Sequence, residues 1–86
     1  MQTIWKYVIN GEGIDLPKGA VIRSTGHDPR GKLCIWVELD DEFDIELVER
    51  HKFHIIGSGH RIPDNGTYLG HVIAGHFVWH IYHECV

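Results

Sequence analysis

The segment Lys32–Asp40 constrains the fold most strongly, because an aliphatic residue stands at every second position along it. One side of this period-two pattern carries only aliphatic residues: Leu33, Ile35, Val37 and Leu39. Successive side chains of a strand point to opposite faces of a sheet, so the pattern predicts a half-buried β-strand. The preceding residues, Asp28-Pro29-Arg30-Gly31, place Asp, Pro and Gly where a type I turn favours them, which predicts a hairpin.

The rest of the chain repeats this organisation, with short segments rich in β-branched and aromatic residues between clusters of turn residues. The strand-like segments are Thr3–Ile9, Ile14–Leu16, Ala20–Thr25, Phe53–Ile56, Tyr68–Ile73 and His76–His83. No segment has a clear amphipathic helical period. We therefore predict one all-β domain over residues 1–86, a small antiparallel barrel or sandwich of six to seven short strands with at most one short helical turn.

The segment Asp41–Arg50 is harder to assign. Phe43, Ile45 and Leu47 alternate as in a strand, but Phe43, Leu47 and His51 would also share one face of a helix. We predict a long hairpin loop with extended ends.

Composition and charge narrow the class of protein. With 86 residues and a hydrophobic fraction of 43%, the chain can form a single core. The net charge of −4 does not indicate the excess of basic residues that binds duplex DNA, so direct nucleic-acid binding is not expected. No apolar run approaches the ~20 residues that span a bilayer, which predicts a cytoplasmic protein without a membrane partner. The two cysteines, Cys34 and Cys85, predict free thiols rather than a disulfide framework.

Acidic residues crowd one part of the chain: Glu38, Asp40, Asp41, Glu42, Asp44, Glu46 and Glu49. One interpretation is a solvated loop that keeps the protein soluble. The other is an acidic surface offered to a basic partner, and its candidate partner-binding residues are Asp41, Asp44 and Glu46.

Histidine is unusually frequent, with eight residues in the chain: His27, His51, His54, His60, His71, His76, His80 and His83. Zinc sites commonly appear as Cys-x-x-Cys or as His pairs at helical spacing, and neither is present. His76 and His80 on one strand would lie ~13 Å apart, too far for one ion. We therefore assign no metal ligand and predict no cofactor. A His-rich metal-binding protein remains an alternative to imidazoles that are simply solvated.

The loop Gly57–Arg61 carries the main candidate site. A nucleophile elbow would need a following helix, and none is predicted, so no catalytic residue is assigned. The loop also lacks the Lys-Ser/Thr ending of a P-loop, and no βαβ unit surrounds it as a dinucleotide fingerprint requires. Simple turn geometry would explain the glycines. Alternatively, the loop binds an anion, because it combines backbone N–H groups, a hydroxyl, an imidazole and a guanidinium. The candidate ligand-binding residues are Ser58, His60, Arg61, His80 from the last strand, and Trp36 or Trp79 as an aromatic wall.

Several motifs occur in order along nearly the whole chain: Ile-Trp-Lys-Tyr, Leu-Pro-Lys-Gly-Ala, Gly-Lys-Leu-Cys-Ile-Trp, Gly-Ser-Gly-His and Phe-Val-Trp-His-Ile. Together they resemble a family of short proteins of phages and bacterial mobile elements, known as a domain of unknown function. Five histidines lie outside the resembling pattern: His51, His54, His71, His76 and His83. A metal site built from these histidines would be peculiar to this protein.

The resemblance supplies no activity and implies only a phage or mobile-element origin. Small phage proteins without catalytic machinery often act as binders, so we expect a non-enzymatic, phage-type binding protein in the host cytoplasm. Such a protein could inhibit host defence by occupying a host protein, or sequester a small anionic, nucleotide-like ligand. Open edge strands in so small a sheet also predict a homodimer.

Overall fold

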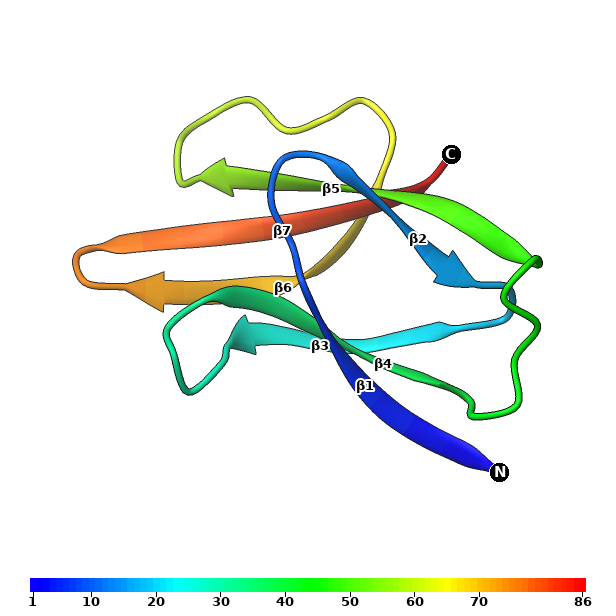
Figure 1. Ribbon diagram of the computed structural model, residues 1–86. Helices are drawn as coiled ribbons and strands as arrows, with labels where there is room; N and C mark the ends of the chain where they lie inside the picture. Colours follow the sequence, from blue (N-terminus) through cyan, green and yellow to red (C-terminus); the bar gives the residue numbers. More distant parts are fainter.

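The computed structural model describes the whole chain, residues 1–86, which forms seven β-strands and no helix (Figure 1). In chain order the strands are β1 (Gln2–Val8), β2 (Gly13–Pro17), β3 (Val21–His27), β4 (Leu33–Asp40), β5 (Val48–Gly57), β6 (Thr67–Ala74) and β7 (Phe77–Cys85). The prediction of an all-β fold with six to seven strands is confirmed. Since the chain forms no helix, it has none long and apolar enough to cross a membrane.

The strands form two antiparallel sheets. One has the strand order β1-β4-β3 and the other the order β2-β5-β7-β6. In Figure 1 the four-stranded sheet lies above the three-stranded one, and β3 runs beside β6 where the sheets meet. The edge strands are β1 and β3 in one sheet and β2 and β6 in the other, and no edge strand pairs with the other sheet, so the sheets do not close into a barrel. Of the two predicted architectures, the structure is the open sandwich.

The core lies between the sheets and is built on the alternation along β4. Ile35 and Val37 are fully buried and Leu39 is nearly so, as the period-two pattern predicts. The four-stranded sheet contributes three more buried side chains: Leu16, Phe53 and Ile81. Burying an aliphatic or aromatic side chain of this size is worth about 1.5–3 kcal/mol, so these contacts are the main force that holds the sheets together.

The turn between β3 and β4 is held by a buried carboxylate. The N–H of Gly31 donates to the carbonyl of Asp28 at 2.8 Å, which confirms the predicted hairpin. One carboxylate oxygen of Asp28 accepts from the N–H groups of Arg30 and Lys32, and the other accepts from Lys6 Nζ at 2.9 Å. The Lys6 ammonium and these N–H groups lower the pKa of Asp28 to about 2. The turn is therefore fastened to β1 by an ion pair.

The connection between β4 and β5 differs from the prediction. Residues 41–47 form a loop, as predicted, but the loop is not a hairpin because β5 pairs with β2 and β7 rather than with β4. The carboxylates of Asp40 and Asp44 accept from the N–H groups two residues ahead, and these Asx turns compete with a strand ladder. The loop therefore carries the chain from one sheet to the other.

The pairing of β7 with β5 determines which side chains meet at the candidate site. His80 pairs with Ile56 and Tyr82 pairs with His54, and all four alternate with the buried Ile81. They therefore share the outer face of the four-stranded sheet, which points away from the core. The predicted hairpin between β6 and β7 is confirmed. It places the outer-face side chains of β6 beside those of β7.

Candidate functional site

The turn after β5 places Ser58 and His60. The N–H of His60 donates to the carbonyl of Gly57 at 3.1 Å. Gly59 has φ of +87°, the left-handed conformation that the third position of a type II turn requires. The prediction that glycines shape a turn here is confirmed. No hydrogen bond of the turn uses the N–H of Ser58 or Gly59, so both donors remain free for a ligand.

Gly57 allows two rings to approach the backbone. A Cβ atom at this position would lie 3.3 Å from ring atoms of both His60 and Trp79, closer than nearly all real Cβ contacts. Glycine therefore lets the imidazole of His60 fold back over the end of β5.

His80 lies between two hydroxyl groups on the outer face. Its Nε2 is 3.0 Å from Ser58 Oγ and its Nδ1 is 3.1 Å from the Tyr68 hydroxyl oxygen. A neutral imidazole donates through one nitrogen and accepts through the other, so one hydroxyl accepts from the ring and the other donates to it. This array fixes the orientation of the ring. The third member is a hydroxyl rather than the carboxylate that orients the histidine of serine hydrolases.

Beside this array, the turn and the sheet enclose a hollow of about 270 Å³. The lining residues are Ile56, Gly57, Ser58, Gly59, His60, Ile62, His80 and Tyr82. Tyr68 contacts two of these lining residues: its ring meets that of Tyr82 edge to face, with centroids 5.3 Å apart, and its hydroxyl is bonded to His80. The hollow thus combines hydroxyl and imidazole groups with an aromatic and aliphatic wall. No lysine or arginine lines it.

Arg61 belongs to a neighbouring hollow. That hollow measures about 320 Å³ and is lined by His54, Ile56, Arg61, Ile62, Pro63 and Asp64. The guanidinium is 3.6 Å from the carboxylate of Asp64, and both side chains are exposed. Ile56 and Ile62 line both hollows, so the two adjoin on this face, and together they are called the groove. The structure therefore brings His60 and His80 together and leaves Arg61 at the far end of the groove.

Neither predicted tryptophan forms the aromatic wall of this hollow. Trp36 lies on β4 in the other sheet and packs against Gly26. Trp79 points to the core side of β7, where it stacks on Phe77. It lines a third hollow of about 330 Å³ with His60 and His76, and this hollow adjoins the first because Gly57, Ser58 and His60 line both. The reason is the strand period, because Trp79 and His80 are neighbours in sequence and point to opposite faces.

Two tyrosines take the place predicted for tryptophan. Tyr68 and Tyr82 form a directly paired position between β6 and β7 on the outer face. Nothing in either segment alone identifies them, because only the pairing register shows that they meet. The signal that could have indicated them was the even spacing of His80 and Tyr82 on one strand.

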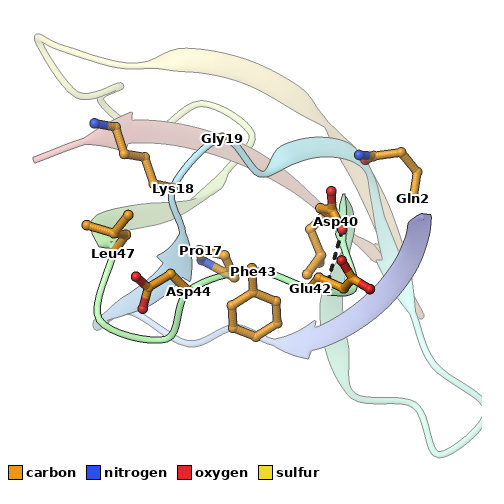
Figure 2. A pocket seen from close by; sticks show the side chains of 10 residues that line it. Gln2, Pro17, Lys18, Gly19, Asp40, Glu42, Phe43, Asp44 and Leu47 are labelled. Carbon is orange, nitrogen blue, oxygen red and sulfur yellow. Dashed lines mark hydrogen bonds between the residues drawn. The ribbon is translucent and has the colours of Figure 1, made fainter.

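The predicted partner-binding residues lie together at the opposite end of the molecule, on the loop from β4 to β5 (Figure 1). Asp41, Asp44 and Glu46 are all exposed. The loop borders a hollow of about 310 Å³ whose lining includes Phe43 and Leu47 (Figure 2). Asp41 is also 3.3 Å from the amino group of Met1.

Exposed aliphatic side chains alternate with these carboxylates. Ile45 is 78% exposed and Leu47 is 55% exposed. Leu47 also lines the hollow beside the loop, together with Phe43, so the apolar side chains add contact area next to the carboxylates. The acidic loop therefore combines charge and apolar surface.

A second imidazole pair lies on the core side of the four-stranded sheet. The rings of His51 and His83 stack with centroids 4.9 Å apart, and Nδ1 of His51 is 2.6 Å from Nε2 of His83. Burial lowers the pKa of both imidazoles, and proximity to His51 lowers that of His83 further. Both rings are therefore neutral at neutral pH.

Comparison with protein families gives a match that spans nearly every residue. Residues 1–85 match the family described as Domain of unknown function (DUF7352). The chain belongs to the DUF7352 family. The DUF7352 match includes both hollows of the groove, the acidic loop and all seven strands. Membership confirms the resemblance to a family of unknown function, and the description of DUF7352 names no activity, ligand or source. No curated protein and no solved structure matches the chain.

Proposed function

We propose that the protein is a non-enzymatic binding protein that acts by occupying a partner protein through its acidic loop. One observation carries the proposal: exposed carboxylates and exposed aliphatic side chains alternate on the loop beside a hollow. Apolar contacts at the centre of a patch with charges at its rim are the usual composition of a protein interface. The complementary partner surface is basic with one or two apolar side chains.

The partner class follows from the resemblance to short phage and mobile-element proteins. We propose a phage-type protein in the host cytoplasm, where the partner is a host protein and the outcome is inhibition of a host-defence system. Carboxylates on a loop can imitate the phosphates that a nucleic-acid-binding host protein recognises. Attraction of this kind speeds association and weakens as ionic strength rises.

Charge reversal of the loop tests the proposal. The triple variant Asp41→Lys, Asp44→Lys, Glu46→Lys should keep its fold, because all three side chains are exposed. We expect at least tenfold weaker binding to the host protein that cross-linking recovers with the wild-type chain. A matched triple reversal at exposed carboxylates elsewhere, Glu12→Lys, Asp15→Lys and Asp64→Lys, should bind within about twofold of wild type. Equal loss in both triples would mean that only net charge matters and would refute a specific loop interface.

A second candidate function is sequestration of a small anionic, nucleotide-like ligand in the groove beneath the β5–β6 connection. The observation in its favour is the array of Ser58, His80 and Tyr68 beside the groove, whose second hollow is lined by Arg61. Aromatic and imidazole rings can stack on a base, and the free N–H groups of the turn can bind an anion. The groove volumes lie near the lower end of the range for small-molecule sites.

Thermal shift with a panel of nucleotides tests this candidate. A ligand at ten times its Kd stabilises the folded state by about 1.4 kcal/mol, which raises the Tm of a domain of this size by roughly 6–11 °C. We expect His60→Ala and His80→Ala to remove the shift, and His27→Ala, an exposed histidine on β3, to retain it. If no nucleotide raises the Tm at millimolar concentration, the groove is not a nucleotide site.

A further inference from the structure

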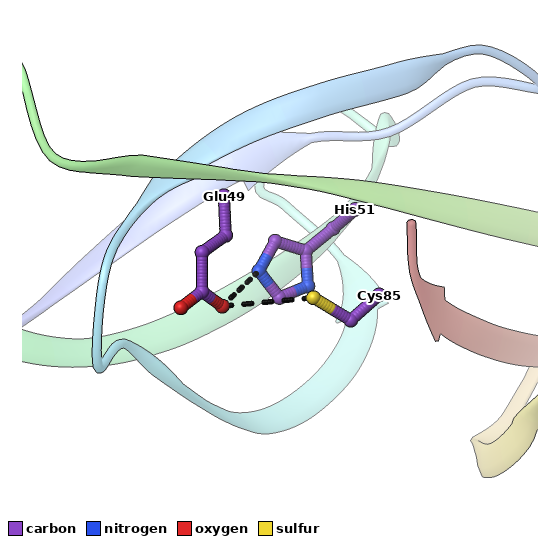
Figure 3. A group of neighbouring side chains, drawn as sticks. All are labelled: Glu49, His51 and Cys85. Carbon is purple, nitrogen blue, oxygen red and sulfur yellow. Dashed lines mark hydrogen bonds and ion pairs between the residues drawn. The ribbon is translucent and has the colours of Figure 1, made fainter.

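A mixed group of potential metal ligands lies where β5 meets the end of β7. Figure 3 shows the side chains of Glu49, His51 and Cys85 turned toward one another. One ligand atom from each residue lies within 4.8 Å of the other two. The Cys85 thiol is 3.6 Å from a carboxylate oxygen of Glu49, and the same oxygen is 3.9 Å from His51 Nε2.

Strand pairing explains why these residues meet. His51 and Cys85 are directly opposite each other on β5 and β7, and Glu49 precedes His51 by two residues on the same face. Directly opposed side chains of an antiparallel pair have Cβ atoms about 4.5–5.5 Å apart. The three ligand atoms therefore come from rigid strands rather than from a mobile loop, which lowers the cost of ordering them around an ion.

The spacing of the atoms suits a tetrahedral ion. With Zn–S of about 2.3 Å and Zn–N and Zn–O of about 2.0–2.1 Å, tetrahedral angles place sulfur about 3.6 Å from oxygen and nitrogen about 3.4 Å from oxygen. The observed separations are 3.6 Å and 3.9 Å. Tetrahedral coordination also places sulfur about 3.6 Å from nitrogen, and the Cys85 and His51 ligand atoms lie within 4.8 Å of each other, so small rotations of the three side chains close them around an ion.

His51 is already prepared to act as a ligand. Its side chain is 8% exposed, and its Nε2 makes no hydrogen bond, since the nearest carboxylate oxygen is at 3.9 Å. Its Nδ1 is 2.6 Å from Nε2 of His83. When His83 accepts that hydrogen bond, the proton of His51 resides on Nδ1 and the lone pair of Nε2 faces Glu49. Metal-binding histidines are almost always oriented in this way by a second hydrogen bond.

We propose that Glu49, His51 and Cys85 bind a thiophilic divalent cation of the Zn²⁺ class, with His83 as a positioning residue and water as the fourth ligand. On binding, the thiol of Cys85 loses its proton to solvent and the thiolate sulfur forms the metal bond. The combination of thiolate, imidazole and carboxylate excludes Mg²⁺ and Ca²⁺, which prefer oxygen ligands alone. This site is separate from the groove and from the acidic loop's proposed interface.

Cobalt titration of the untagged full chain tests the site, because Co²⁺ bound by thiolate gives a charge-transfer band in the near ultraviolet. We expect saturation at one Co²⁺ per chain and displacement by Zn²⁺. Cys85→Ser should abolish the band, and Glu49→Gln should weaken binding. The matched control is His54→Gln on the outer face, whose imidazole lies 3.1 Å from Glu84 with no thiol nearby; this variant should bind as wild type does.

His83 is tested by a variant that retains a ring. His83→Phe removes the hydrogen-bond acceptor of His51, and loss of such a partner typically weakens metal binding about 10–100-fold. We expect that loss of affinity with the charge-transfer band retained at saturation. Absence of the band in the wild-type chain, or an undiminished band in Cys85→Ser, would overturn the proposed site. Unchanged affinity in His83→Phe would overturn the positioning role.

Discussion

At the scale of single residues, the most consequential polar group of the fold is the carboxylate of Asp28. Its side chain is 2% exposed, and it accepts three hydrogen bonds that join the β3–β4 turn to Lys6 on β1. Each bond is made to the ionised form. The interaction therefore depends on pH, whereas the aliphatic contacts of the core do not.

We predict that this carboxylate makes the stability of the protein sensitive to acid. The pKa of Asp28 is lowered from 3.8 to about 2, first by the bond from Lys6 and then by the N–H of Lys32. A lowered pKa in the folded state contributes stability above the unfolded value, and that contribution is lost as pH falls from about 4 to about 2. Urea unfolding should therefore show Asp28→Asn to be less stable than wild type at pH 7, with the difference shrinking across that interval.

The control for the Asp28→Asn experiment is an acidic residue whose carboxylate accepts no hydrogen bond. Glu12 is exposed and its carboxylate has no partner in the structure, so Glu12→Gln should remain as stable as wild type at every pH. A difference between Asp28→Asn and wild type that stayed constant down to pH 2 would contradict the role assigned to the ionised carboxylate.

At the scale of elements, β5 organises the molecule. Its core face carries Phe53 into the sandwich and presents His51 and Glu49 to β7, while its outer face carries His54 and Ile56 to the groove. The alternation of a strand makes this division possible, because residues adjacent in sequence serve opposite faces. The groove, at one end of β5, and the proposed cation site, at the other, can therefore be disrupted independently.

The β4–β5 connection shows that the sequence did not indicate which strands β5 would pair with. Alternation along residues 41–47 predicts extended chain, but these residues form turns, and Ile45 and Leu47 are exposed like the carboxylates between them. The two Asx turns and the pairing of β5 with the other sheet decide against a hairpin. Turn chemistry of this kind is visible in sequence, but which sheet receives the next strand depends on contacts distant along the chain.

At the scale of the whole molecule, the domain is flat and incompletely buried. Its radius of gyration is 13.3 Å, above the roughly 12 Å expected for a compact chain of this length. Its extents are 40 × 31 × 17 Å, and only 12 of 86 residues are buried. The unpaired edge of β1 carries two large, half-exposed apolar side chains, Ile4 and Trp5. Such an edge is a template for another strand.

We predict that two chains pair through the β1 edge. Size-exclusion chromatography with light scattering should give about twice the chain mass of 9.9 kDa at micromolar concentration. A lysine on an open edge opposes pairing, so Ile4→Lys should shift the mass toward the monomer. Ile73→Lys, at a similarly exposed position on β6, should leave the dimer intact because that strand lies beside β3. A monomer mass for the wild-type chain would refute the dimer.

The sequence by itself determined the all-β class, the strand along β4, both hairpins and the turn at Gly57, because each follows from local period and turn chemistry. Only the tertiary structure decided which side chains meet. The pairing register places Tyr68 opposite Tyr82 and Cys85 opposite His51. Trp36, Trp79 and Arg61, which were predicted to lie with His80, do not line its hollow. Strand pairing is a long-range contact whose energy is shared across a sheet, so no single segment encodes the neighbours that its side chains acquire.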